Sequence, residues 1–161
     1  MKKIAAILLL LAIAAGFASC GNTPDSPASP AKEPTIEELT TELDKVFDAD
    51  AMHELDAERV ERELGLSADA FTAYAMKVPT GTNMDEYGVF IAASGREQEV
   101  MNAVNAYIGS RQERWMDEYL PDERPKIFDA QAKSQGKYVI YVMAFEDNRS
   151  KAINAFDKLT K

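Results

Sequence analysis

Apolar positions recur at helical spacing in two segments that follow residue 34. The first segment begins at Thr35, which can cap a helix, and its first turn is acidic, as the helix dipole favours. Its apolar positions fall on one helical stripe: Ile36, Leu39, Leu43, Val46 and Phe47. The second segment covers residues 56–64 and ends at Gly65. The pattern therefore predicts two amphipathic helices at the start of the folded part.

From residue 71 the pattern changes to apolar, strand-like runs separated by turn residues. Runs at 71–78 and 87–94 precede a long helical stripe over 96–119, and runs at 127–133 and 138–145 precede a closing helix. We predict an α+β domain, in which two N-terminal helices precede an antiparallel four-stranded sheet with helices packed on one face. The run at 138–145 is apolar on both sides, which indicates a central or covered strand.

The two halves of this pattern resemble each other. At one constant offset, Tyr87, Phe90, Ile91 and Ala93 match Tyr138, Tyr141, Val142 and Ala144. A duplicated strand-strand-helix unit would produce this match. Chance similarity between amphipathic segments is the alternative, and the sequence leaves both open.

The first twenty residues have the three-part plan of an export signal. Lys2 and Lys3 precede an apolar run over 4–17, which is too short to span a bilayer comfortably. The segment Phe17-Ala18-Ser19-Cys20 resembles the lipobox of bacterial lipoproteins, although Phe17 stands where an aliphatic residue is usual. That resemblance implies a diacylglyceryl group on the Cys20 thiol and cleavage before it. An ordinary signal peptide cut near Ala18 is the alternative.

We therefore divide the chain into a signal peptide at 1–19, a tether at 20–34 and a single domain at 35–161. The tether is rich in Pro, Ser and Ala and lacks apolar periodicity, so it cannot bury enough surface to fold. Two acyl chains on Cys20 would hold the protein stably on the outer, extracytoplasmic face of the cell membrane.

Composition limits the partners. The formal net charge is -9, so the chain repels phosphate backbones and no nucleic acid partner is expected. With 46% hydrophobic residues the chain can form a core, and its one cysteine excludes an internal disulfide.

Catalytic and metal-binding patterns are lacking. His53 is the only histidine, we place it in a polar junction between the first helices, and we expect neither a metal nor a cofactor. Adjacent carboxylates such as Asp85-Glu86 and Asp117-Glu118 are common in so acidic a chain and carry no specific signal.

The most distinctive stretch is residues 111–125. Arg111 falls on or beside the apolar stripe of the long helix, where a buried guanidinium needs a partner. One interpretation is a binding site for an anion or a peptide carboxylate, formed with Trp115 and Tyr119. The other, which we favour, is an internal ion pair that fixes the helix.

These features together resemble a family of bacterial lipoproteins catalogued as domain of unknown function 4358. The shared features are the lipobox, the linker, an acidic residue such as Glu86 before a strand and a long helix with Arg111. The most specific are Tyr119-Leu120-Pro121 and Gly136-Lys137-Tyr138. The resemblance implies a surface-attached domain without an assigned activity.

Three functions remain for the domain. We expect a non-enzymatic module that binds a ligand or an envelope protein. A cell-wall hydrolase with an Asp/Glu pair would instead need a cleft with two carboxylates. A structural subunit of a membrane complex would leave an apolar patch on the sheet face opposite the helices.

Overall fold

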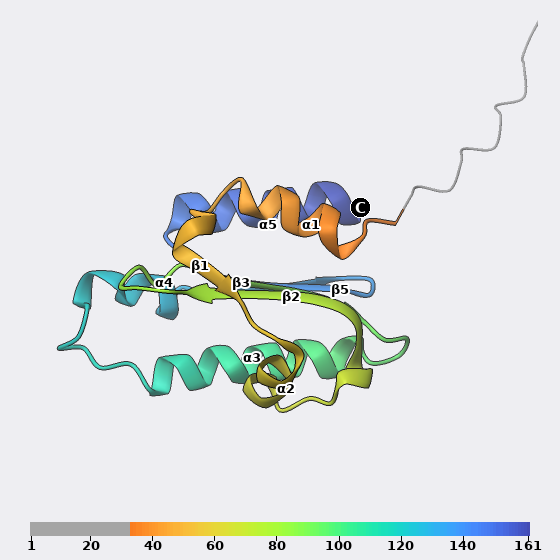
Figure 1. The fold of residues 1–161 in the computed structure, drawn as a ribbon, viewed down its shortest axis with the longest axis horizontal. Coiled ribbons are helices and arrows are strands. Elements are labelled where there is room, and N and C mark those ends of the chain that lie inside the picture. Colours follow the sequence, from red (N-terminus) through yellow and green to blue (C-terminus); the bar gives the residue numbers. More distant parts are fainter. Residues whose placement is uncertain (1–32) are drawn as a thin grey trace, which may run out of the picture. The chain divides into compact units, whose positions relative to one another are not determined.

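Five strands form one antiparallel sheet in the computed structural model, which describes residues 33–161 (Figure 1). In space the strands lie in the order β1-β2-β3-β5-β4. The strands are β1 (Met52–Glu54), β2 (Phe71–Pro79), β3 (Glu86–Ala92), β4 (Gln131–Gln135) and β5 (Tyr138–Met143). The helices of this part of the chain are α1 (Ile36–Asp44), α2 (Ala57–Leu64), α3 (Glu97–Glu113), α4 (Arg124–Phe128) and α5 (Glu146–Thr160). The α+β class is therefore confirmed.

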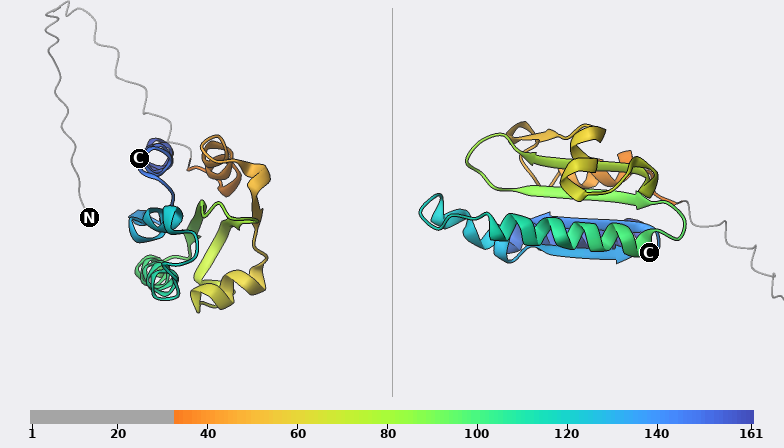
Figure 2. Two further views of the ribbon diagram at one scale, coloured as in Figure 1. Left: turned by 90° about the vertical axis from the view of Figure 1, so that its left-hand side faces the viewer. Right: turned by 90° about the horizontal axis from the view of Figure 1, so that it is seen from below.

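Helices cover both faces of the sheet. In Figure 1, α1 and α5 lie above the sheet and α2 and α3 lie below it, and the end-on view in Figure 2 shows the same three layers. The expectation of helices on one face is wrong. The physical reason lies in the central strands. Every residue of β5 is buried, and its side chains alternate between a hydrophobic core on the side of α2 and α3 and a second core on the side of α1 and α5.

The sheet has five strands, and the predicted count of four is wrong because β1 was missed. A strand of three residues is too short to show an alternating pattern. It pairs antiparallel with β2 at the sheet edge, where His53 faces Val78 across the ladder. His53 therefore belongs to a strand rather than to a polar junction. Since β1 lies between α1 and α2, the two helices do not together precede the sheet.

The first two helices have defined ends. Thr35 and Glu38 form a reciprocal capping box at the start of α1, as the sequence predicts for Thr35. The Asp56 side chain caps α2 by accepting a hydrogen bond from the Arg59 backbone N–H. Gly65 ends α2 in the left-handed conformation, with φ of 64°. Val60 and Leu64 of α2 are buried against α3 and the sheet.

The segment after α3 differs from its prediction. The helix ends at Glu113 instead of continuing to Tyr119, and a turn with Leu120 at φ of 54° leads into Pro121. Ile127 and Phe128, which the apolar pattern assigns to a strand, belong to α4. Two adjacent apolar residues fit a strand and a helical turn equally well, so the pattern could not separate them.

The repeat is visible in the strands and stops at the helices. Tyr87 pairs with Val142, and Ile91 pairs with Tyr138, so the register between β3 and β5 is symmetric under the sequence offset. The following helices, α3 and α5, nevertheless pack on opposite faces (Figure 2). A rotation that superposes the two hairpins would place both helices on one face. The strand-strand-helix order therefore repeats without forming one repeated rigid unit.

Candidate functional site

A polar cavity of about 350 Å³ opens beside the C-terminal half of α3. Its walls come from β1, α2, the end of β2, the loop between β2 and β3, the start of β3, and α3. The titratable side chains that line it are His53, Arg59, Glu63, Glu86, Tyr107, Arg111 and Arg114. Apolar side chains, among them Leu55, Val78 and Met84, complete the wall. We call it the arginine cavity.

The helical spacing of α3 places two arginines in the wall of the arginine cavity. In α3, Val104, Tyr107 and Ile108 are buried, and Arg111 continues the same stripe one turn later. Arg114, the C-cap residue directly after α3, follows Arg111 by three positions and lines the same cavity. The side of α3 that is apolar along most of the helix therefore carries two guanidinium groups at its C-terminal end.

Glu86 fixes the position of Arg111 from the opposite wall. It is fully buried at the start of β3, and its Oε2 accepts a hydrogen bond of 3.2 Å from Arg111 Nη2. Its Oε1 accepts hydrogen bonds from the hydroxyls of Tyr107 and Tyr141, at 2.6 and 2.8 Å. Both carboxylate oxygens are therefore engaged, and a bridge joins α3, β3 and β5. This is the internal ion pair that the sequence analysis favours for Arg111.

A glycine makes room for this network. Gly88 faces Tyr141 across the β3–β5 ladder. A Cβ placed on Gly88 would lie 2.3 Å from the Tyr141 ring and 2.9 Å from the Phe90 ring, closer than side chains can approach. Tyr141 thus occupies the space above Gly88, and from there its hydroxyl reaches Glu86. The backbone of Gly88 needs no special conformation. The glycine is therefore required only because Tyr141 packs so closely against it.

The electrostatics follow from burial. Burial raises the pKa of Glu86, although Arg111 and the two tyrosine hydroxyls oppose this shift. Burial also raises the pKa of Tyr107 and of Tyr141, and the Glu86 charge adds to both shifts. For Arg111, burial is the largest single influence and lowers the pKa, but Glu86, Tyr107, Tyr141 and Glu63 together outweigh it, so the pKa is raised overall. Arg111 therefore stays cationic in the cavity wall.

Of the three residues proposed from sequence as a binding site, only Arg111 lines the arginine cavity. Arg111 lines the cavity with a side chain that is 30% exposed. Trp115 is half-buried against the core, and its Nε1 has no hydrogen-bond partner within the described part of the chain. Tyr119 is 59% exposed and lies in the turn after α3. Neither Trp115 nor Tyr119 lines the cavity, because α3 ends before them and the helical stripe is interrupted.

Sequence reasoning missed most of the residues that do line the cavity. Arg59 and Glu63 precede the buried Val60 and Leu64 by one position each, so the apolar pattern of α2 already placed them at the edge of the buried face. Arg114 could have been found from its spacing to Arg111. No sequence signal connects α2 with α3, and this contact is what makes the site.

The loop that closes the cavity on one side is held by a buried lysine. Lys126 of α4 is 3% exposed and lies 2.8 Å from Glu123 and 3.0 Å from Asp85. Its Nζ also donates to the Asn83 side chain, at 2.6 Å. Glu123 accepts a further hydrogen bond from the Met84 backbone N–H. The loop before β3 is thereby fixed to α4.

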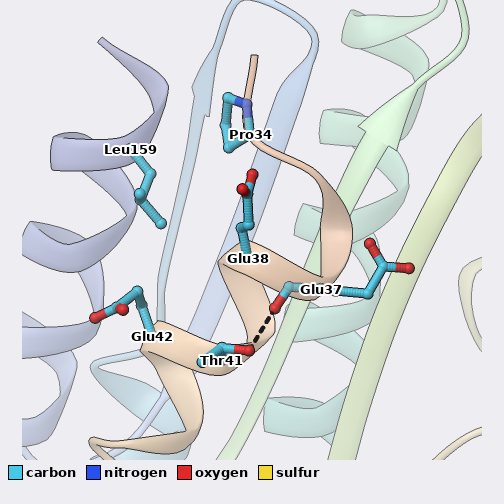
Figure 3. Close-up of a pocket in the computed structure, with 6 residues that line it drawn as sticks. All are labelled: Pro34, Glu37, Glu38, Thr41, Glu42 and Leu159. Carbon is cyan, nitrogen blue, oxygen red and sulfur yellow. Dashed lines mark hydrogen bonds between the residues drawn. The ribbon is translucent and has the colours of Figure 1, made fainter. Parts of the chain in front are cut away.

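A second hollow, of about 410 Å³, lies between α1 and α5 and differs in character. Figure 3 shows Glu37, Glu38 and Glu42 projecting from α1, with Leu159 of α5 on the other side. The Thr41 hydroxyl donates to the Glu37 carbonyl within the same helix. The carboxylates belong to the outer surface of one helix, and nothing in their arrangement selects a ligand.

Two further observations concern membranes and metals. Between residues 33 and 161, no helix is both long enough and apolar enough to cross a bilayer. In the same range, no three His, Cys, Asp or Glu side chains are grouped so as to hold a metal ion. Cys20, the proposed lipidation site, the signal peptide and most of the tether lie outside the described residues.

Comparison with known proteins gives one match. The family model described as Domain of unknown function (DUF4358) matches residues 45–144. This range contains all the residues of the arginine cavity named above and leaves out α1 and α5. No curated protein and no solved structure matches the chain.

Proposed function

Because the chain belongs to the family of domain of unknown function 4358, whose description assigns no activity, we propose its function from the predicted signal peptide with its lipobox and from the arginine cavity. The protein is a lipoprotein held on the extracytoplasmic face of the membrane by a lipid on Cys20. Its domain is a non-enzymatic binding module. The ligand is a small anion, or the anionic group of an envelope partner, and it binds in the arginine cavity.

The single observation that carries the binding role is the convergence of three arginines on one open cavity. Arg59 comes from α2, and Arg111 and Arg114 come from the end of α3. Only Arg111 is bonded to a carboxylate of the domain within residues 33–161. Guanidinium groups bind carboxylates and phosphates through paired N–H donors, and such bonds are stronger than neutral ones. The cavity thus has more cationic donors than its own carboxylates use.

The assignment as non-enzymatic rests on Glu86. Its raised pKa would suit a general acid, but a catalytic carboxyl must reach the substrate. Both Glu86 oxygens are bonded to Arg111, Tyr107 and Tyr141, and the side chain has no exposed surface. The group therefore supports the cavity wall and is not presented to a ligand.

A hydrolase is the alternative function, because Glu63 and Glu86 line the same cavity and the pKa of Glu86 is raised, but it would require Glu86 to leave its hydrogen bonds with Arg111, Tyr107 and Tyr141. Release of soluble fragments from purified cell walls by the intact chain, abolished by Glu63→Gln, would favour it. The third function, a structural subunit, loses its support because helices cover both faces of the sheet.

Arg59→Gln is expected to weaken anion binding about 10- to 100-fold, since one charge-assisted hydrogen bond contributes about 1.5–3 kcal/mol. The unfolding free energy should change by less than about 0.5 kcal/mol, because the Arg59 side chain is exposed and makes no ion pair among the described residues. Isothermal calorimetry with inorganic phosphate and small carboxylates measures the first effect, and urea unfolding measures the second.

Arg62→Gln is the matched control. Arg62 belongs to the same helix, is 58% exposed and does not line the cavity, so its replacement should leave anion binding unchanged. Equal losses in the two variants would mean that α2 attracts anions only through its overall charge. Absence of binding to any anion in the parent chain would contradict the proposed function.

Cys20→Ala is expected to remove the protein from the membrane fraction or to leave it uncleaved, without unfolding the domain. The anchor depends on the thiol, and the tether separates Cys20 from α1. Fractionation of cells, followed by mass measurement of the product, tests this. Ser26→Ala in the tether should behave like the parent. A Cys20→Ala protein that is processed and fractionates normally would show that the anchor assignment is wrong.

A further inference from the structure

Glu63 places a carboxylate among the arginines of the cavity. It lies on α2 four residues after Arg59, so the two side chains stand on the same side of the helix. Asp56 at the start of α2 and the buried Val60 and Leu64 fix the rotation of the helix. Glu63 is half-buried and lines the same cavity as Arg111 and Arg114.

This carboxylate is close to the arginines without being bonded to them. Its charge contributes to the raised pKa of Arg111 and of Tyr107, so it acts across the cavity on the Glu86 network. Within the described residues, however, Glu63 makes no hydrogen bond and no ion pair shorter than 4 Å. A carboxylate that served only to neutralise an arginine would be expected to contact one.

The arrangement therefore offers two kinds of polar contact at once. Arg59 and Arg114 provide donors for an anionic group, and Glu63 provides an acceptor for a cationic one. Leu55, Val78 and Met84 add apolar wall beside them. A cavity of about 350 Å³ falls in the range that holds a small organic ligand.

We infer that the ligand is a zwitterion, namely an amino acid or short peptide whose carboxylate binds the arginines and whose ammonium group binds Glu63. The inference rests on the proposed function and deepens it, because it specifies what the anionic ligand carries besides its negative charge. An uncharged side chain of the ligand would contact the apolar wall.

The test is calorimetry on the purified full-length chain with a panel of amino acids and dipeptides that have free termini, each compared with its N-acetylated form. Acetylation removes the ammonium group and keeps the carboxylate. At least one free compound should bind, and its acetylated form should bind about 10- to 100-fold more weakly, as expected for loss of one charge-assisted hydrogen bond.

Two variants make the test specific. Glu63→Gln keeps the shape of the side chain, removes its charge and should abolish the preference for the free amine. Glu58→Gln is the matched control, since Glu58 lies on the same helix, is 91% exposed and does not line the cavity, and it should keep the preference.

The outcomes separate the inference from the function on which it rests. If free and acetylated compounds bind equally, and Glu63→Gln strengthens the binding of both, Glu63 is only a counter-charge and the inference is wrong, while anion binding stands. If no compound binds and phosphate and simple carboxylates also fail, the proposed function is wrong as well.

Discussion

Glu86→Ala is expected to lower the unfolding free energy by about 3–5 kcal/mol, because it removes one partner of a buried ion pair. The Arg111 guanidinium would keep its charge without its carboxylate, and the hydroxyls of Tyr107 and Tyr141 would lose their acceptor. The change would also leave a void where a fully buried side chain stood. Urea unfolding followed by circular dichroism measures the loss.

Glu86→Gln separates the charge from the shape. It keeps the volume and an acceptor oxygen, so it should cost less than alanine. Since burial raises the pKa of Glu86 above its ordinary value of 4.5, the folded state binds the proton more tightly than the unfolded state. The stability that this provides is fully present below pH 4.5 and is lost as the pH rises through the folded-state pKa. As the pH rises from 4.5 through the folded-state pKa of Glu86, the unfolding free energy of the parent should therefore fall relative to that of Glu86→Gln. Parallel pH profiles for the two proteins would contradict the raised pKa.

Gly88→Ala is the second change with a large expected effect, roughly 3 kcal/mol of destabilisation or more. The added methyl group would lie 2.3 Å from the Tyr141 ring, inside a sheet that is buried on both faces. Tyr141 must then move, and its hydrogen bond to Glu86 is lost with it. Thermal unfolding measures the destabilisation, and the near-ultraviolet circular dichroism of the tyrosines reports the displaced ring.

Gly109→Ala provides a control of opposite sign. Gly109 lies inside α3, and among the described residues a Cβ there would meet no atom within 4 Å apart from its chain neighbours and the nearby backbone of the helix itself. Alanine is the better helix former by about 1 kcal/mol, so this variant should be slightly more stable than the parent. A Gly88→Ala protein as stable as Gly109→Ala would show that the Tyr141 ring yields without cost.

Periodicity predicted the parts of the fold that are long enough to show it. The apolar stripe of α3 and the doubly apolar run of β5 indicated their environments correctly, since every residue of β5 is buried. Periodicity could not find β1, because its three residues are too few to establish an alternating pattern. It also could not decide on which face a helix packs, because that depends on the path of the chain between elements. The opposite placement of α3 and α5 is such a case.

The site was predictable only where one element contains the signal. Arg111 stood out as a charge on an apolar stripe, and its ion pair with Glu86 joins two positions that the sequence had each marked separately. Arg59 and Glu63 belong to a short polar helix like many others, and their relevance appears only when α2 packs beside α3. Trp115 and Tyr119 were chosen on a helical spacing that ends with α3 at Glu113.

The bonded state of Arg111 also affects the thermodynamics of recognition. An exposed arginine such as Arg59 samples many rotamers and loses this freedom when a ligand binds, at a cost of about 0.5–1.5 kcal/mol. Arg111 is already held by Glu86, so its side chain is ordered during folding. A ligand that contacts Arg111 therefore meets a preorganised donor, and the entropic penalty of binding arises mainly at Arg59.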